Sequence, residues 1–357
     1  MIAASPRTPG ISVVVCLYNA ARFIADTIES VLTQSWRDFE LIVVDDGSTD
    51  DSAAIVQRRF DDPRLTLVRL RHRGLGATRA AGVERARAPY IAFLDHDDVW
   101  DPSKLQRQMA AAESAPDAGL LFSDSALIDE HGRALGAMSQ RFNYPCFDLA
   151  AGRAEIELLA RGCFIPLSTT LVRADLLARA GGVDARYQSA GDYDMWLRLA
   201  RISNVVYVPE QLSSWRVHAG QLTQRHCQRT VADLRRIWGP MTRQKQYSSH
   251  LRALVCEHLV GQQRSTITAL LRQGRLPAAA RVACAMLAEP RALAAYIARR
   301  AHLVRPGKLP SLVRRALAAV CTSDGGRRPS AAALVASIGD DRVRLESLPL
   351  TLTREAS

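Results

Sequence analysis

Short apolar runs alternate with stretches of helical spacing through the first third of the chain. The runs are rich in branched and aromatic residues, a pattern typical of buried strands. The predicted strands are Ile11–Leu17, Phe39–Val44, Leu65–Leu70 and Tyr90–Leu94. Amphipathic segments follow each of them, as where Phe23, Ile24 and Ile28 fall on one helical face. Strand and helix that alternate in this way predict a parallel sheet with crossover helices.

The pattern is less regular after residue 115 but continues to about residue 225. Further strands are predicted at Gly119–Ile128, Ser168–Val172 and Val205–Val208, and helices at 102–115, Arg153–Arg161, 175–181 and Ala190–Leu199. From residue 226 the composition changes to alanine, leucine and arginine with helical periodicity. The predicted organisation is therefore a leader (1–10), an α/β domain (11–225), a basic helical region (226–321) and a disordered tail (322–357).

Charge is concentrated in the helical region. Residues 227–321 carry 17 Lys and Arg against 3 Asp and Glu, a net charge of +14, whereas the whole chain carries +11. The α/β domain is therefore near neutral, and its charge gives no reason to expect nucleic-acid binding. Seven scattered cysteines without a Cys-x-x-Cys pair favour a reducing compartment. The N-terminus lacks signal-peptide features and no apolar run approaches 18 residues, so a cytoplasmic protein is predicted.

The strand Tyr90–Leu94 ends in three crowded carboxylates, Asp95, Asp97 and Asp98. They would lie at the carboxyl edge of the sheet, where open α/β folds bind ligands. Carboxylates this close repel one another unless a cation or a network of donors offsets their charge. A hard divalent cation that also binds phosphate is the simplest offset, and a solvated acidic turn is the alternative.

Two other functions are consistent with parts of this pattern. An apolar strand that ends in Asp95-His96-Asp97-Asp98 also resembles phosphotransferases that use an aspartate nucleophile, here Asp95. The lysine of that family has no counterpart in a matching context, and the strand is fourth instead of first. A non-catalytic module that binds glycan or lipid is the second alternative.

One family accounts for the segments together. Their order and spacing resemble glycosyltransferase family 2, inverting enzymes of the GT-A fold that use nucleotide-diphosphate sugars. The segments that carry the resemblance are Ile11–Asn19, Phe39–Asp50, Tyr90–Asp98, Gly181–Asp184, Gly191–Leu199 and Trp215–His218. The resemblance covers about residues 11–225 and implies a Rossmann-like, mainly parallel nucleotide-binding sheet flanked by helices.

The resemblance assigns roles in donor binding. Tyr18 would border the nucleobase, unless it is an ordinary core tyrosine. Asp46, or its neighbour Asp45, would accept a hydrogen bond from the ring N–H of uracil or thymine, although Asp45 could serve as a cap. Arg79 would lie near the nucleotide, with a solvated helix arginine as the alternative. Asp95 would contact the ribose, the metal ion or both.

The metal ion and the catalytic base are assigned in the same way. Asp97 would bind Mn²⁺ or Mg²⁺ together with Asp95, and His218 would complete the site unless it is a surface histidine. Asp192 would be the base that takes the acceptor hydroxyl's proton, with helix capping as its alternative role. Gly191 stands where the family usually has an acidic residue. Asp194 is expected to turn away from the site.

The resemblance implies a metal-dependent transferase that moves a sugar from a UDP- or dTDP-sugar to a hydroxyl of a glycan. Assembly of bacterial surface polysaccharide is the expected setting, with a glycan or a lipid-linked glycan as acceptor. The basic helical region either lies on an anionic membrane surface, which would place the enzyme at the inner face of the membrane, or packs as a cap with a solvated basic face.

Overall fold

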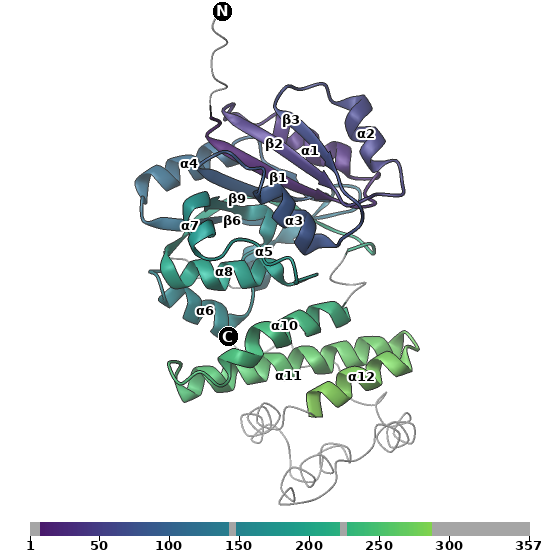
Figure 1. Cartoon of the computed structure of the whole chain (residues 1–357), viewed down its shortest axis with the longest axis vertical. Helices are drawn as coiled ribbons and strands as arrows, with labels where there is room; N and C mark the ends of the chain where they lie inside the picture. The colour runs from purple at the N-terminus through teal and green to yellow at the C-terminus, as the bar shows by residue number, and fades with distance from the viewer. Residues whose placement is uncertain (1–7, 143–147, 222–226, 288–357) are drawn as a thin grey trace, which may run out of the picture. The chain divides into compact units, whose positions relative to one another are not determined.

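The computed structural model describes residues 8–142, 148–221 and 227–287 (Figure 1). The chain divides into two compact units, Met1–Ile237 and Trp238–Ser357. The predicted tail (322–357), residues 288–321 of the predicted helical region and residues 1–7 of the predicted leader lie outside the described residues.

The first unit begins with the predicted alternation of strands and helices. In order, the elements are β1 (Ile11–Leu17), α1 (Ile24–Leu32), β2 (Phe39–Asp45), α2 (Ser52–Arg59), β3 (Leu65–Arg69), α3 (Leu75–Val83) and β4 (Tyr90–Asp95). β1 lies between β2 and β4 and is parallel to both, with Val13 opposite Leu41 on one side and Ala92 on the other. β3 extends this parallel sheet beyond β2. The predicted parallel arrangement is confirmed here.

The second half of the unit adds antiparallel pairings to the same sheet. Its elements are β5 (Val99–Trp100), α4 (Lys104–Ser114), β6 (Ala118–Asp129), β7 (Ala134–Ala137), α5 (Met138–Phe142), α6 (Arg153–Arg161), the 3-10 turn η1 (Leu167–Thr169), β8 (Thr170–Arg173), α7 (Ala174–Arg179), α8 (Gly191–Ile202) and β9 (Asn204–Val217). Among the described residues the strand order is β3-β2-β1-β4-β8-β6-β9-β5, with β7 paired to β6. β8 is antiparallel to β4 and β6, whereas β9 is parallel to β6.

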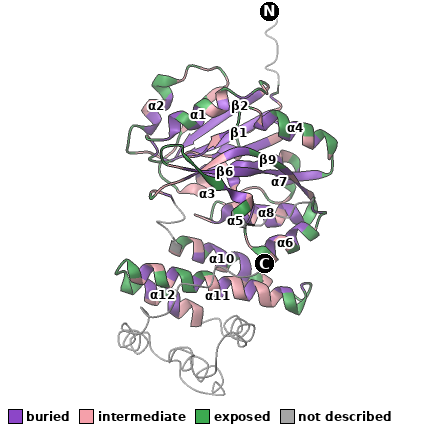
Figure 2. Cartoon of the chain, turned by 180° about the vertical axis from the view of Figure 1, so that it is seen from behind, coloured by how far each residue is buried: buried purple, intermediate pink, exposed green. Residues whose placement is uncertain are grey.

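Helices cover both faces of the sheet, so its central strands are buried throughout (Figure 2). Alternate residues of a strand point to opposite faces. The odd-numbered residues of β1 pack with apolar side chains of α1, α2 and α4. On the other face, a Cβ at Gly82 would lie 2.4 Å from Val14, so α3 packs unusually close to β1. Phe93 also points to this face and meets Trp196 of α8 edge-on.

Two predicted strands differ from those observed. Val205–Val208 and the segment that ends at His218 form one continuous strand, β9, whose register against β6 shifts near Asp124. The predicted strand at Ser168–Val172 begins as the η1 turn, because the Thr169 and Thr170 hydroxyls donate to backbone carbonyls three residues earlier. These local bonds hold a turn in place of an extended chain.

The helical elements are α10 (Cys227–Met241), α11 (Ser249–Arg272) and α12 (Leu276–Leu287). α10 crosses the division between the two units, and α11 and α12 belong to the second unit. Ser248 caps α11 by accepting a hydrogen bond from the Leu251 N–H. In the described part of the chain no helix is long and apolar enough to span a membrane.

Candidate active site

The carboxyl ends of β1, β2 and β4 meet at one edge of the sheet. The register pairs Cys16 with Asp95 and Leu17 with Asp45, so the loops that follow these strands start side by side. The predicted nucleobase and metal residues are therefore brought to the same edge, as expected for a parallel sheet.

Asp97 and His218 are in direct contact, although 121 residues separate them. His218 Nε2 lies 2.9 Å from Asp97 Oδ2, and both side chains are largely buried. His218 Nδ1 accepts a hydrogen bond from the Gly220 N–H. In this arrangement Nε2 carries the proton and donates a hydrogen bond to the Asp97 carboxylate. His218 is thus not the solvated surface histidine that the sequence left as an alternative.

Asp98 and Arg216 hold this contact together, and the sequence analysis gave neither residue a role. Asp98 accepts hydrogen bonds from the Arg216 N–H at 2.9 Å and from the Ser168 hydroxyl at 2.6 Å. The Arg216 guanidinium donates back to the Asp97 carbonyl at 2.8 Å. These bonds join the loop after β4 to the end of β9, which carries His218. The sequence did offer one signal for Asp98, its place as the third carboxylate of the acidic cluster.

The carboxylates of this loop differ in their titration. Burial raises the pKa of Asp95 to about 6, with the charge of Arg79 opposing and that of Asp97 adding to the effect. Burial also acts to raise the pKa of Asp97, but the His218 hydrogen bond and nearby histidine charges outweigh it, and that pKa is lowered. Asp97 therefore loses its proton at a lower pH than Asp95 does, which suits a ligand for a cation.

The structure gives partial support to the predicted three-residue metal site. No group of three His, Cys, Asp or Glu side chains in the described ranges could hold a metal ion. Asp97 and His218 do lie together, and a cation that binds phosphate needs few protein ligands because the phosphate oxygens supply others. Asp97 fits this use directly, whereas His218 fits with its proton moved from Nε2 to Nδ1.

The predicted nucleobase residues form a second cluster. Tyr18 is 38% exposed, which excludes the core-tyrosine alternative, and its ring stacks on His72 at 4.4 Å between centroids. The buried Asp46 carboxylate accepts hydrogen bonds from the Arg73 and Gly74 N–H groups and lies 2.9 Å from His72 Nδ1. His72 was not predicted. The sequence shows only that His72 follows the third strand. That it stacks on Tyr18 is visible only in the folded chain.

Asp45 is fully buried and makes fewer bonds than Asp46. Its Oδ1 accepts the Ser48 N–H at 3.0 Å, a local turn contact of the kind expected for a cap. Its Oδ2 lies 3.6 Å from the Arg69 guanidinium and accepts no hydrogen bond within the described residues. Asn19 joins the loops after β1 and β2, since its side-chain oxygen accepts the Thr49 N–H at 2.8 Å.

Arg79 lies within electrostatic reach of both Asp95 and Asp192. It is only 3% exposed, so the solvated-arginine alternative is wrong. Its Nε has no hydrogen-bond partner among the described residues. Its charge acts to lower the pKa of both Asp95 and Asp192. A buried guanidinium with an unused donor is costly unless a ligand completes its hydrogen bonds.

Asp192 stands in the first turn of α8 but does not cap it. The N-cap is Ala190, which has no side chain that can accept a hydrogen bond, and Asp192 Oδ1 accepts only the adjacent Tyr193 N–H at 2.8 Å. Burial raises the pKa of Asp192, against the lowering effect of Arg79. Asp194 is turned away as predicted, into an ion pair with Arg198 at 2.7 Å.

Glycines bring this part of the chain close to α3. A Cβ at Gly76 would meet the Tyr187 carbonyl oxygen at 2.2 Å, so only glycine allows this approach. A Cβ at Gly191 would lie 3.7 Å from Arg79 Nη1. The segment before α8 therefore packs against α3, and Asp192 comes within the electrostatic reach of Arg79.

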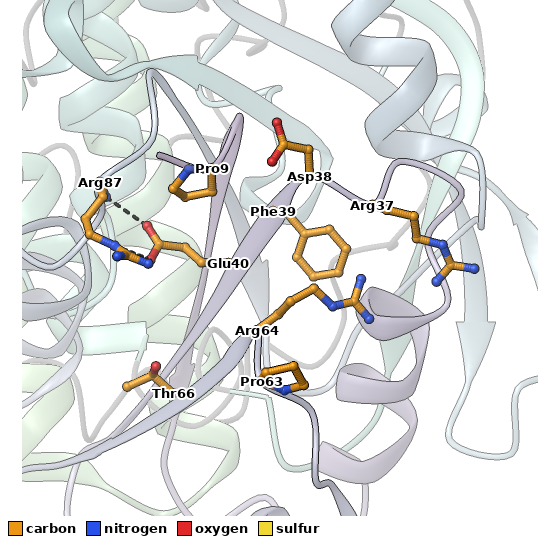
Figure 3. A pocket seen from close by; sticks show the side chains of 9 residues that line it. All are labelled: Pro9, Arg37, Asp38, Phe39, Glu40, Pro63, Arg64, Thr66 and Arg87. Carbon is orange, nitrogen blue, oxygen red and sulfur yellow. Dashed lines mark hydrogen bonds and ion pairs between the residues drawn. The ribbon is translucent and has the colours of Figure 1, made fainter. Parts of the chain in front are cut away.

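A cavity of about 270 Å³ lies elsewhere, at the amino ends of the strands (Figure 3). Arg87 pairs there with Glu40 at 2.7 Å, and Arg64 pairs with Asp62 at 2.7 Å and stacks on Phe39. These charges satisfy one another. The cavity is therefore a poorer candidate for a ligand site than the carboxyl edge.

The sequence and the fold both resemble those of known glycosyltransferases. Residues 12–133 match glycosyl transferase family 2. An uncharacterized glycosyltransferase of Rickettsia prowazekii (strain Madrid E) is 27% identical over 219 residues, which cover 60% of this chain and 66% of that protein. The succinoglycan biosynthesis protein ExoO of Rhizobium meliloti (strain 1021) is 38% identical over 138 residues, which cover 38% of this chain and 39% of that protein. The chain thus spans less than two-thirds of the length of these relatives.

Two solved structures share the fold. One is S. aureus TarS 1-349 in complex with UDP-GlcNAc, with a TM-score of 0.63, 17% identity and coverage of 86% of this chain and 87% of that one. The other is the mannosyltransferase PcManGT from Pyrobaculum calidifontis in complex with GDP-Man and Mn²⁺, with a TM-score of 0.53, 19% identity and coverage of 94% and 88%.

The chain has the fold of the GT-A glycosyltransferases. The predicted fold class is confirmed, with a mixed sheet in which the strands β1–β4 are parallel. Residues 12–133 match glycosyl transferase family 2, the family that the motifs predicted. This finding favours a glycosyl transferase over the phosphotransferase and the non-catalytic module.

Proposed function

We propose that the protein transfers a sugar, with inversion, from a nucleotide-diphosphate donor to a hydroxyl group of a glycan. The observation that carries this proposal is the convergence of the Asp97–His218 pair, the buried Arg79 and the partly buried Asp192 at one edge of the sheet. An inverting transfer needs a cationic region for the leaving diphosphate and a carboxylate opposite to it.

In this proposal Asp97 and His218 hold a divalent cation, Mn²⁺ or Mg²⁺. When bound, the ion supplies positive charge that stabilises the diphosphate as it leaves. His218 contributes with its proton on Nδ1, which requires release of the Gly220 N–H contact. An imidazole ligand favours Mn²⁺ over Mg²⁺. The PcManGT complex with GDP-Man and Mn²⁺ supports this choice by analogy of fold.

Donor recognition is assigned to the cluster after β1 and β2. Tyr18 offers an exposed aromatic face for a nucleobase, and Asp46 stands beside it as an acceptor for a ring N–H. Both Asp46 oxygens already accept backbone N–H groups, whereas Asp45 Oδ2 has no hydrogen-bond partner within the described residues and is the alternative acceptor. A carboxylate acceptor suits the N–H of uracil or thymine, so UDP- and dTDP-sugars are the proposed donors, with Asp95 close to the ribose. The TarS complex with UDP-GlcNAc supports a uridine nucleotide.

Asp192 is the proposed general base. Its Oδ2 makes no hydrogen bond within the described residues that would compete for a proton, and burial raises its pKa toward the operating range of the enzyme. Asp194 cannot replace it, because both of the Arg198 donors that contact it hold it in an ion pair. The proton of the acceptor hydroxyl would therefore move to Asp192 as the sugar–oxygen bond forms.

A screen of nucleotide sugars tests the proposed function. Purified protein is incubated with UDP-, dTDP- and GDP-sugars, with Mn²⁺ or with EDTA, and released nucleoside diphosphate is measured with water as acceptor. We expect release from a UDP- or dTDP-sugar that depends on Mn²⁺. Metal-independent release, or release from GDP-sugars alone, would contradict the assigned donor chemistry.

We also propose that the second unit binds an anionic membrane surface, which would bring the enzyme to a lipid-linked acceptor in polysaccharide assembly. Its exposed cations are Arg243, Lys245, Arg264, Arg272, Arg275 and Arg281. Between residues 238 and 287 the sequence has one acidic residue, Glu257. Each basic side chain near an anionic surface contributes about 1 kcal/mol. The similarity to ExoO, a succinoglycan biosynthesis protein, supports the setting.

Vesicle sedimentation with the whole protein tests the membrane proposal. We expect binding to phosphatidylglycerol vesicles at low salt and none to phosphatidylcholine vesicles. The Arg272→Gln and Arg275→Gln double variant should bind about 10-fold or more weakly, at about 1 kcal/mol for each charge. Equal binding to both vesicle types would contradict the proposal and leave the solvated basic cap as the explanation.

A further inference from the structure

A buried carboxylate of α10 holds the segment that leads into Asp192. Asp233 is 1% exposed. Its Oδ2 accepts three backbone hydrogen bonds, from the N–H groups of Gln188 and Ser189 at 2.8 Å and of Ala190 at 3.2 Å. These are the three residues immediately before the first residue of α8.

These bonds fix the backbone just before α8, where the helix has no N-cap side chain of its own. A polar N-cap residue normally fixes the start of a helix by bonding N–H groups of its first turn. Here the N-cap is Ala190, whose side chain cannot accept a hydrogen bond. Asp233, 43 positions beyond Ala190, instead bonds the N–H of Ala190 and those of the two residues before it. The start of α8 is therefore fixed by α10 as well as by its own sequence.

A second contact joins the same two segments. The hydroxyls of Ser189 and Thr230 are 2.7 Å apart, and Thr230 stands one turn before Asp233 on α10. One residue before this segment, the Tyr187 carbonyl packs against Gly76 of α3. Residues 187–190 therefore contact two helices, through the Asp233 carboxylate of α10 and through the close approach to Gly76 of α3.

The charge of Asp233 also reaches Asp192. Burial raises the pKa of Asp192 most, Arg79 opposes this rise, and Asp233 adds to it. Asp233 in turn faces Arg236, whose guanidinium lies 3.4 Å from Oδ1 and is mostly exposed. The negative charge of Asp233 is thus stabilised mainly by the three backbone N–H groups, and the exposed Arg236 adds little.

We propose that Asp233 is a positioning residue for the base Asp192. By gathering three N–H groups on one oxygen, Asp233 sets where α8 starts and so where the Asp192 carboxylate stands relative to the donor. This inference rests on the proposed function of Asp192. It also means that the helical region supplies a part of the catalytic arrangement through α10.

The opposing explanation is that Asp233 only stabilises the fold. The two roles differ in what they change. A positioning residue affects turnover at saturating donor and leaves nucleotide affinity unchanged, because the donor cluster belongs to β1, β2 and β4. A stabilising contact changes the melting temperature, and kcat is then normal below the melting transition. A misplacement of about 1 Å at a base costs on the order of 100-fold in rate.

The experiment compares Asp233→Ala and Asp233→Asn with the control Thr230→Val, which removes the other contact between the two segments. Asn keeps a carbonyl oxygen that can accept the three N–H groups, whereas Ala has no acceptor. Each variant is measured for Mn²⁺-dependent release of nucleoside diphosphate from the best donor of the screen, for calorimetric affinity toward UDP with Mn²⁺, and for hydrogen exchange at residues 188–190.

We expect Asp233→Ala to lower kcat about 10- to 100-fold with UDP affinity within about twofold of wild type. Asp233→Asn should recover most of the rate, and Thr230→Val should keep nearly all of it. Amide exchange at 188–190 should be faster in the Ala variant. An unchanged kcat in Asp233→Ala, or an equal loss in Thr230→Val, would overturn the positioning role.

The Asp192→Asn variant separates this inference from the proposed function. If Asp192→Asn releases nucleotide as fast as wild type, or if no donor is turned over, the proposed function fails. Hydrogen exchange at residues 188–190 then still tests whether Asp233 holds this segment. Normal protection of 188–190 in Asp233→Ala would overturn the claim that Asp233 holds the segment.

Discussion

Both edges of the sheet carry charged groups, but these groups are paired within the protein to different extents. At the amino edge, Glu40 accepts hydrogen bonds from Arg87 (Figure 3) and from Ser12, and Arg64 pairs with Asp62. At the carboxyl edge, the carboxylates of the loop after β4 crowd together, and burial raises the pKa of Asp95 and Asp98.

This difference between the two edges indicates that a ligand binds at the carboxyl edge. Charges that find partners within the protein stabilise it and offer nothing further to a ligand. Arg79 Nε and Asp45 Oδ2 at the carboxyl edge are buried and have no hydrogen-bond partner within the described residues. An uncompensated buried group costs stability, and a ligand that satisfies it recovers that cost as binding free energy.

The largest expected effect concerns Asp192. Asp192→Asn cannot take a proton at neutral pH and should slow transfer at least about 100-fold, with normal folding and UDP affinity. Because the pKa of Asp192 is raised above its usual 3.8, the wild-type rate should increase with pH through that raised pKa. The variant should lose this limb of the pH–rate profile. Asp194→Asn, which breaks only the Arg198 pair, serves as control, and equal losses in both would contradict the assignment.

The next effect concerns cation binding at the same edge. Asp97→Ala removes the ionised carboxylate and leaves the His218 donor without its partner. Asp97 is the proposed metal ligand, and mutation even of a residue that only orients a metal ligand costs about 10- to 100-fold in metal affinity, so a loss of at least about 10-fold is expected. Calorimetry with UDP should show this loss in Mn²⁺ and no difference from wild type in EDTA. An unchanged affinity in Mn²⁺ would remove Asp97 from the metal site.

A smaller effect is expected at the nucleobase cluster. Tyr18→Ala removes the exposed ring that stacks on His72. A base stacked on an aromatic side chain gains about 1–3 kcal/mol, so UDP should bind roughly 5- to 150-fold more weakly. Tyr18→Phe keeps the ring and should bind UDP as wild type does. Similar UDP affinities of Tyr18→Ala and wild type would show that the base lies elsewhere.

The smallest effect on activity is expected at the amino edge. Glu40→Gln weakens the bonds to Ser12 and Arg87 and should lower stability by about 1–3 kcal/mol without change in turnover. Burial acts to raise the pKa of Glu40, but these bonds outweigh it and lower that pKa, so their contribution is present at neutral pH. It is lost as the pH falls through the lowered pKa. In urea unfolding, the free energy of unfolding of Glu40→Gln should therefore be lower than that of wild type at neutral pH, and the difference should shrink in acid. A loss of turnover at pH 7 in this variant would contradict a purely structural role of the amino edge.

Much of the fold could be predicted because its signals are local. The parallel strands β1–β4 follow from apolar runs and helical spacing that need no knowledge of distant residues. Their carboxyl ends then had to share one edge, so Asp46, Asp95 and Asp97 were located correctly. The η1 turn and the continuous strand β9 were missed, because hydroxyl-to-carbonyl bonds and pairing with β6 override the local pattern.

The sequence by itself determined which residues reach the edge, and the tertiary structure alone decided what they meet there. The family resemblance grouped Asp97 with His218, but no local pattern indicates that Asp98 and Arg216 join these two residues in one network. The same holds for Asp233, whose partners stand more than 40 residues earlier. The alternation of residues along a strand indicates which of its faces is buried. A contact between a carboxylate and a donor that is distant in the chain depends on how whole elements pack. That packing is a property of the folded chain and leaves no local pattern to read.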